Sequence, residues 1–475
     1  MASTTPVRPT LLRQLGIISA TALVVSNMIG TMIFTTTGFL AGDLGSPKLV
    51  LLIWIVGAVC ALLGAVCYSE LGINLPSSGG EYVYLTRAYG PTWGFMSGWV
   101  SFFAGFSGPI ALAALAFADY LGHFCESCAE HAPHILLGSG EWTLQFGKQQ
   151  MFACGLVLVF TVLNLFGVQR VARIQNVLTG LKVVILVAFI GMAFGMGHGN
   201  WQNFSMNAHR TSSVPIAEQF AISLFFIYLA YSGWNAATYV AEELHQPSRT
   251  LPRALAIGTT LVAALYIALN VVFIYATPLE NMKPENMKGE LAVASLAASH
   301  LFQLDVARLF SALIALALMS TVSAMVTIGP RVYYAMAKNG AFLASAAKVH
   351  PRWRTPWVSI LAQGVCTMLM TMTPFPQLVI YIGFTLSFFA AMGVASLFHF
   401  RRQPGWKKLR SVSFCWPLVP VLFLIPEAWM VIWGVQLKPI ISLATVLTMV
   451  TGALVYHFRI RPRRRIDDSA AVETY

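Results

Sequence analysis

Long apolar stretches separated by short polar segments run along the whole chain. Residues 50–69, for example, contain no charged side chain. As a helix rising about 1.5 Å per residue, such a stretch crosses a hydrocarbon core of about 30 Å. The pattern predicts about twelve membrane-spanning helices, near residues 15–42, 48–73, 91–121, 149–167, 172–197, 215–241, 252–277, 303–337, 356–373, 377–400, 414–434 and 438–458.

Composition agrees with this pattern and excludes a soluble domain. The chain is 57% hydrophobic and 10% charged, with a mean hydropathy of +0.69, whereas soluble domains carry about 25% charged residues. The first apolar stretch is too long for the core of a signal peptide, so we expect it to stay as the first helix. The fold class that follows is an all-α, multi-pass membrane protein.

The net charge is +12, and the positions of the basic residues along the chain indicate the topology in the membrane. Roughly 22 of the 30 Lys and Arg residues fall in alternate connections, on the side that also holds both chain ends. The positive-inside rule therefore predicts a protein of the cell membrane, plasma or inner, with both termini in the cytoplasm, in contact with membrane lipids and not with nucleic acid. The expected organisation is a cytoplasmic N-terminus at 1–14, a core of the first ten helices at 15–400, two further helices at 401–459 and a basic cytoplasmic tail at 460–475.

Two of the predicted spans contain an interruption near mid-membrane. The first carries glycine among polar residues at 27–33, and the sixth carries a similar group at 228–235. A lone mid-span glycine usually marks close helix packing. Two interrupted spans at corresponding positions of oppositely directed halves instead indicate a secondary transporter with a site at the midplane.

The direction of each span decides what its break offers. The outer half of the first span begins near residues 31–33, where free amides and a positive helix end suit a carboxylate. The outer half of the sixth span ends near residues 228–230, where free carbonyls suit an ammonium group. An amino acid carries both charges on one carbon. The predicted substrate-binding residues are Met28, Ile29, Gly30, Thr31, Met32, Ile33, Leu229, Ala230, Tyr231, Ser232, Gly233 and Asn235.

No acidic residue is evident within the two breaks, which favours a neutral substrate over a cationic one. Lys182 is different, because it lies nine residues into the fifth span from Arg173, about 13 Å deep. Placing a charged lysine at that depth in the membrane costs about 3 kcal/mol, so such a residue usually has a function. The alternative is that the lysine is paired with backbone carbonyls and has only a structural role. We predict a coupling role for Lys182, with Ser320, Thr321 and Ser323 as partners.

Other classes of function find little support in the sequence. No intramembrane His/Asp cluster, Gly-x-Ser-x-Gly motif or phosphate-binding loop is present, so we do not expect an enzyme, and no ring-forming segment suggests a channel. Cys125 and Cys128 lie near His123, His131 and His134, but their spacing matches no strong zinc pattern. We expect no metal and no cofactor.

Several motifs, in order, resemble those of the amino acid–polyamine–organocation (APC) superfamily, and within it the L-type amino acid transporter (LAT)-like branch. The similarity covers roughly residues 10–400, and its motifs lie at 29–34, 76–82, 230–235, 242–243, 251–254, 329–337, 350–351 and 355–356. The resemblance implies a LeuT-like 5+5 inverted repeat with discontinuous helices 1 and 6 and two extra C-terminal helices. It also implies backbone recognition of the substrate, and a helix-five lysine, matched by Lys182, that stands in for sodium.

Three features depart from the family pattern. Met32 stands where the family has the second glycine of its first break, and Leu229 stands where many members have an aromatic gate. The loop around Cys125 does not match the cysteine through which animal relatives bind a glycoprotein heavy chain, so that partner is not predicted.

The function predicted from the sequence is secondary transport of small neutral amino acids by alternating access, as an exchanger without sodium. Proton-coupled symport remains an alternative, as does transport of polyamines or cationic amino acids.

Overall fold

The computed structural model describes residues 13, 15–77, 79–122, 134–139, 142–166, 168–287, 293–302, 304–338, 340–373 and 375–461. Within them, eleven helical segments are long and apolar enough to cross a membrane, and the shorter apolar helix α13 (Trp357–Met370) lies where the ninth span is expected. The all-α membrane fold expected from the hydropathy pattern is therefore confirmed. A small antiparallel hairpin of β1 (His134–Ser139) and β2 (Trp142–Phe146) was not predicted.

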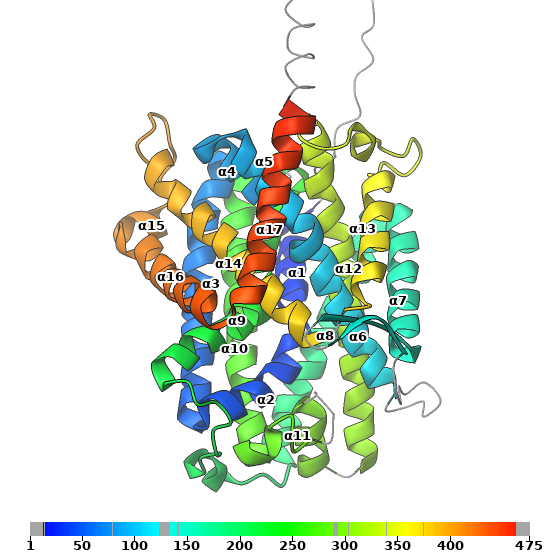
Figure 1. The fold of residues 1–475 in the computed structure, drawn as a ribbon, viewed down its shortest axis with the longest axis vertical. Helices are drawn as coiled ribbons and strands as arrows, with labels where there is room; N and C mark the ends of the chain where they lie inside the picture. Colours follow the sequence, from blue (N-terminus) through cyan, green and yellow to red (C-terminus); the bar gives the residue numbers. More distant parts are fainter. Residues whose placement is uncertain are drawn as a thin grey trace, which may run out of the picture.

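The helices form one bundle with few long connections (Figure 1). The N-terminal half contains α1 (Ile17–Met28), α2 (Met32–Leu44), α3 (Pro47–Asn74), α4 (Glu81–Tyr89), α5 (Pro91–Val100), η1 (Ser101–Ser107), α6 (Gly108–Gly122), α7 (Lys148–Leu165), α8 (Val168–Gly195) and η3 (Trp201–Ser205). The middle contains α9 (Ile216–Tyr231), η4 (Ala236–Glu243), α10 (Pro247–Ala276), η5 (Leu279–Met282), α11 (Val293–Leu301) and α12 (Leu304–Lys338). The remainder contains η6 (Ala344–Ala347), α13, α14 (Phe375–Phe400), α15 (Arg410–Phe414), α16 (Leu418–Leu437), α17 (Pro439–Val455) and η7 (Tyr456–Ile460).

Both predicted interruptions are real breaks in the helices. The first span divides into α1 and α2, with three non-helical residues between them. The sixth span divides into α9 and the 3₁₀ helix η4, joined by a turn at residues 232–235. α10 packs against α1, and α2 packs against α9, so the two broken spans lie together in the middle of the bundle.

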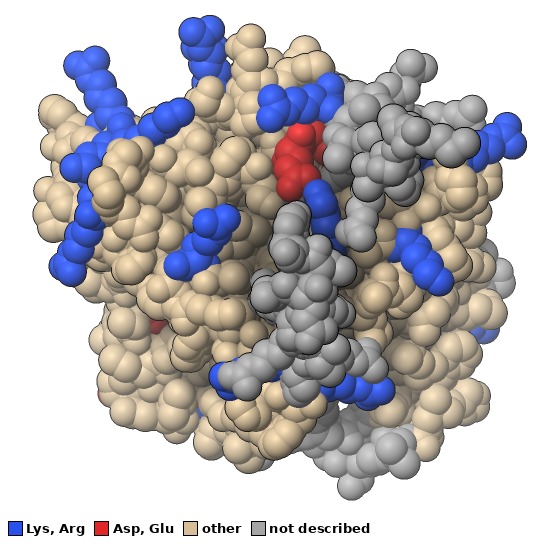
Figure 2. All heavy atoms as spheres, turned by 90° about the horizontal axis from the view of Figure 1, so that it is seen from above, with Lys and Arg blue, Asp and Glu red and all other residues tan. Residues whose placement is uncertain are grey.

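We call the end of the bundle at which α1 begins and η7 ends the terminal end; it is uppermost in Figure 1. Here the backbone of Leu15 pairs with the segment that follows η4, through Leu15 N to Glu243 O at 2.9 Å and His245 N to Leu15 O at 2.9 Å. Seen from above, Lys and Arg side chains gather around this face, with a small acidic group near its centre (Figure 2).

Candidate functional site

A cavity lies between the two helix breaks. The residues that line it come from α1, α2, α6, α9 and α12 and from the turns between them: Asn27, Met28, Gly30, Thr31, Met32, Pro109, Leu112, Ala113, Leu229, Ala230, Ser232, Thr321 and Met325. We call it the break cavity. Seven residues predicted to bind the substrate line it, namely Met28, Gly30, Thr31, Met32, Leu229, Ala230 and Ser232.

At the first break, the backbone leaves the helical path after Met28. Ile29 has ψ of 87°, and the Gly30 amide turns back to donate to Met28 O at 2.9 Å. The next three amides, of Thr31, Met32 and Ile33, donate to no backbone carbonyl of the described residues. Free amides at the start of α2 carry the positive end of its dipole, as anion binding requires.

Gly30 faces open space at this break. A Cβ atom added there would meet a single neighbouring atom within 4 Å, Thr321 Cγ2 at 3.9 Å. The glycine is therefore not explained by close helix packing, and its missing side chain leaves room for a ligand beside the unwound backbone. Met32, where the family has a second glycine, does line the cavity, at 4% exposed.

At the second break, two carbonyls expected to be free are occupied. Leu229 O accepts from Ser232 N at 3.1 Å, and Ala230 O lies 3.1 Å from the hydroxyl of Tyr266. Each carbonyl oxygen has two lone pairs, so either can still accept a second hydrogen bond, from a substrate ammonium group. The Tyr266 hydroxyl also lies 2.5 Å from Met28 O, which places this α10 side chain against both breaks.

The two breaks are also in direct contact. Gly233 has φ of +98°, in the region that favours glycine, and a Cβ atom there would lie 2.8 Å from the carbonyl carbon of Asn27. Any larger residue would push the breaks apart. In contrast to Gly30, this glycine is required for packing.

Lys182 ends directly behind the first break. Its ammonium group, on a side chain 1% exposed, donates to Ile29 O at 2.7 Å, to Thr321 Oγ1 at 2.8 Å and more weakly to Ser26 O at 3.4 Å. Thr321 itself donates to Ile29 O at 2.6 Å. The ammonium group is thus surrounded by oxygen atoms at a helix break, which is the arrangement a small bound cation would have.

The other predicted partners of Lys182 lie close by but contact other groups. The Ser320 hydroxyl is 2.5 Å from that of Ser26, and Gln175 donates to Ser26 at 2.6 Å. The Ser323 hydroxyl is buried and bonds no described residue. These contacts tie α1 to α8 and α12 just beside the lysine.

Some predicted site residues lie outside the break cavity. Ile29 and Ile33 are buried in the core, and the Tyr231 hydroxyl donates to Trp54 O at 3.1 Å, towards α3. Gly233 and Asn235 line a second, neighbouring cavity. Cys125, Cys128, His123 and His131 lie outside the described residues, within which no group of three His, Cys, Asp or Glu side chains could hold a metal.

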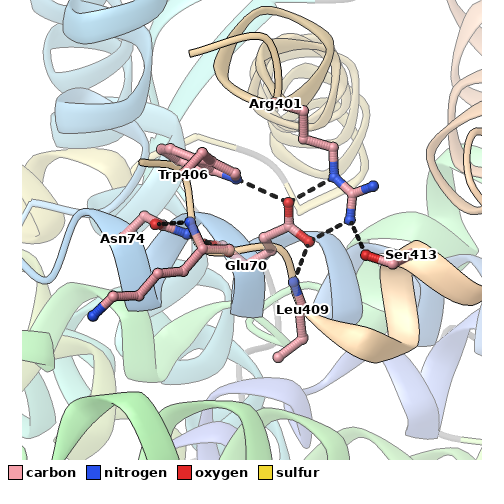
Figure 3. Close-up of polar contacts among 7 residues, drawn as sticks. Glu70, Asn74, Arg401, Trp406, Leu409 and Ser413 are labelled. Atoms are coloured by element: carbon pink, nitrogen blue, oxygen red, sulfur yellow. Dashed lines mark hydrogen bonds and ion pairs between the residues drawn. The ribbon is translucent and has the colours of Figure 1, made fainter. Parts of the chain in front are cut away.

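Three acidic residues outside the two breaks are buried. Glu243 forms an ion pair with Arg331 of α12, with Nε and Oε1 2.5 Å apart. Glu70 forms another with Arg401 at the end of α14 (Figure 3). Glu427 of α16 is 2% exposed and lines a small apolar pocket with Tyr228 and Cys60. The hydropathy pattern gave no signal for Glu427, because one acid does not interrupt an apolar helix.

Sequence reasoning missed two further groups near the breaks, Tyr266 and Glu81. A mid-span tyrosine in an otherwise apolar helix was the available signal for Tyr266. Glu81 was noticed only as part of a motif between the second and third spans, and nothing local to it indicated that it would reach the sixth span.

Comparisons with known proteins agree with this geometry. Residues 15–455 match the family model described as amino acid permease. The chain is 28% identical to the large neutral amino acids transporter small subunit 2 of Mus musculus, covering 94% of this chain and 80% of that protein. It is 28% identical to the serine/threonine exchanger SteT of Bacillus subtilis (strain 168), over 86% and 88% of the two chains, and 25% identical to the Asc-type amino acid transporter 1 of Mus musculus, over 94% and 81%. With two helix breaks around one cavity and a match over nearly its full length, the chain belongs to the amino acid permease family, in the LAT-like branch of the APC superfamily.

Proposed function

We propose that this amino acid transporter exchanges small neutral amino acids across the membrane by alternating access, without sodium. The observation that carries the proposal is the break cavity, which is lined both by the start of α2, with its free amides, and by the carbonyl end of α9 at Leu229 and Ala230. The amides suit the substrate carboxylate, and the carbonyl end of α9 suits its ammonium group.

The sodium-independent part of the proposal rests on Lys182. Its ammonium group already contacts the carbonyl of Ile29 and the hydroxyl of Thr321. These are the oxygen ligands that a sodium ion would need at the same place. Exchange is favoured over net uptake by the similarity of this chain to a serine/threonine exchanger. Proton-coupled symport is the second candidate, because a lysine without an acidic partner can give up its proton.

We also propose that the terminal end faces the cytoplasm of the cell membrane. Support comes from the Lys and Arg side chains that gather on this face (Figure 2) and from the positive-inside rule. A heavy-chain partner is not part of the proposal, since the loop that would carry its cysteine lies outside the described residues.

The test is counterflow in proteoliposomes containing the purified protein. Vesicles preloaded with unlabelled serine or alanine are expected to accumulate the labelled amino acid equally in sodium and in choline medium. Empty vesicles are expected not to accumulate it under a pH gradient; if they do, symport replaces exchange. The methyl esters of the same amino acids should compete poorly, because they lack the carboxylate that the α2 amides would bind, and equal competition would refute the proposed pose.

A further inference from the structure

Glu81 is the first residue of α4, in the segment that joins the spans α3 and α5. The preceding Gly80 has φ of +48°, and a Cβ atom there would lie 2.4 Å from the ring of Tyr239. This close approach brings the start of α4 against η4, the second half of the broken sixth span. As a result Glu81 is 6% exposed although it lies outside the membrane-spanning helices.

Neutral groups surround the Glu81 carboxylate. Its Oε1 accepts from the Tyr68 hydroxyl at 2.9 Å and from Asn235 Nδ2 at 3.0 Å. Four tyrosines are the titratable groups that face it: Tyr68 of α3, Tyr84 of α4, Tyr228 of α9 and Tyr239 of η4. No basic side chain of the described residues lies close enough to affect its pKa. A buried carboxylate without a cation is costly when ionised.

The carboxyl group lines the second cavity, which we call the Glu81 cavity. Its lining includes Tyr228, Ser232, Gly233, Asn235 and Tyr239, and it shares Asn27, Ser232 and Met325 with the break cavity. Asn235, which donates to Glu81, belongs to the turn that forms the second break. A change of charge on Glu81 therefore acts directly on the turn that forms the second break.

Burial raises the pKa of Glu81 to about 7, although the hydrogen bonds from Tyr68 and Asn235 act in the opposite direction. A carboxyl group in this condition changes its charge within the physiological range. Exposure to water would remove the cause of the shift and bring the pKa back towards its ordinary value.

We propose that Glu81 is a proton-binding residue of the transport cycle, which takes a proton from water at the terminal end when η4 closes over it and returns that proton to the same side when η4 moves away. The inference rests on the proposed transport function but not on the identity of the substrate. Protonation favours the closed arrangement, so acid on this side stabilises it and alkali favours opening. No proton crosses the membrane through this residue.

The test compares Glu81→Gln and Tyr68→Phe with the wild type in proteoliposomes, with equal pH on both faces and with labelled serine exchanged for serine. In the wild type, the protonated fraction of a group titrating near pH 7 falls about tenfold between about pH 6 and about pH 8, and the exchange rate should follow in one step. Glu81→Gln should abolish the step. Tyr68→Phe should move it to higher pH, because the hydrogen bond that favours the ionised form is lost.

A matched control is Glu242→Gln at the same end of the bundle. Glu242 is half-buried and accepts from Ser77 Oγ at 3.1 Å, and its removal should leave the step in place. A step that persists in Glu81→Gln, or one that Glu427→Gln abolishes instead, overturns the proposal. So does a selective loss of competition by lysine in Glu81→Gln, since the carboxylate would then hold a cationic side chain and not a proton.

If the protein exchanges no amino acid, the proposed function fails. The Glu81 proposal can then still be tested by measuring thermal stability as a function of pH. The thermal stability of Glu81→Gln relative to the wild type should increase as the pH rises from 4.5 to about 7 and then stay level, because the variant cannot acquire the buried charge. A stability difference that is independent of pH overturns the Glu81 proposal separately.

Discussion

Two buried carboxylates on neighbouring elements, Glu70 and Glu81, have opposite surroundings. Glu70 of α3 is 0% exposed and accepts from Arg401 Nε at 2.7 Å, Arg401 Nη2 at 2.6 Å, Trp406 Nε1 at 2.9 Å and Leu409 N at 2.8 Å (Figure 3). Glu81 accepts two neutral donors, has no cation nearby and lines a cavity.

The Glu70 cluster joins the end of α3 to the end of α14 and to the segment that follows it. Arg401 also donates to Ser413 at 3.1 Å, and Asn74 bonds the Lys407 backbone (Figure 3). The Arg401 guanidinium lies over the Trp416 ring, 4.1 Å from its centroid. Because both Glu70 oxygens are paired with Arg401 and accept further hydrogen bonds, this cluster holds the helices in place. The difference teaches that compensation by a cation, and not burial, separates an anchoring carboxylate from one available to change its charge.

The largest effect is expected from Arg401→Ala, which leaves the Glu70 carboxylate buried without its cation. Breaking a buried pair in this way costs about 3–5 kcal/mol. The melting temperature of the detergent-purified protein should fall strongly, and Arg401→Lys should recover part of the loss. A melting temperature unchanged in Arg401→Ala would remove the contrast between the two carboxylates.

The second largest effect is expected from Lys182→Ala. Like Glu81, Lys182 is a buried ionisable side chain without an oppositely charged partner among the described residues. Losing its charged hydrogen bonds to Ile29 O and Thr321 Oγ1 should cost transport about 2–3 kcal/mol, or roughly 30- to 150-fold in rate. Expression and size-exclusion behaviour should remain normal, because no buried carboxylate of the described residues is left unpaired. Wild-type counterflow in this variant would eliminate the assigned coupling role.

Glu81→Gln should have a moderate effect of opposite sign to Arg401→Ala. An acid whose pKa is raised on folding, here from 4.5 to about 7, destabilises the folded protein progressively as the pH increases between those two values. Above the higher value the stability changes no further. The neutral amide should therefore stabilise the protein at about pH 8 by on the order of 1–2 kcal/mol and have little effect at about pH 4. Thermal unfolding at the two pH values measures this difference, and a destabilised variant at both would place Glu81 with Glu70.

The smallest effect on folding should come from Gly30→Ala, because an added Cβ meets Thr321 Cγ2 alone, at 3.9 Å. We expect a change in stability below about 1 kcal/mol, with weaker substrate competition in counterflow because the methyl group enters the break cavity. Gly233→Ala is the matched comparison, since its Cβ would contact the Asn27 backbone at 2.8 Å and strain a positive φ. Equal loss of stability in both variants would show that Gly30 is a packing residue after all.

The positions of the two helix breaks were predictable from the sequence. The side chains that surround the breaks were predictable only in part. Glycine and polar side chains at mid-span located the breaks, and direction along the chain assigned the free amides to α2. The occupation of Ala230 O by Tyr266 was not predictable, because that hydroxyl comes from another helix 36 residues away in sequence. The same limit applies to Glu81 and Asn235, which are separated by 154 positions.

The sequence by itself determined the elements that follow from local chemistry: the apolar spans, their order and the two interruptions. Hydrogen bonding within a helix and burial in lipid depend on residues close together in the chain, so their pattern is visible there. Only the tertiary structure decided which carboxylate meets a cation. Glu70 and Glu81 look alike in the sequence, and their different surroundings arise from side chains that distant helices bring beside them.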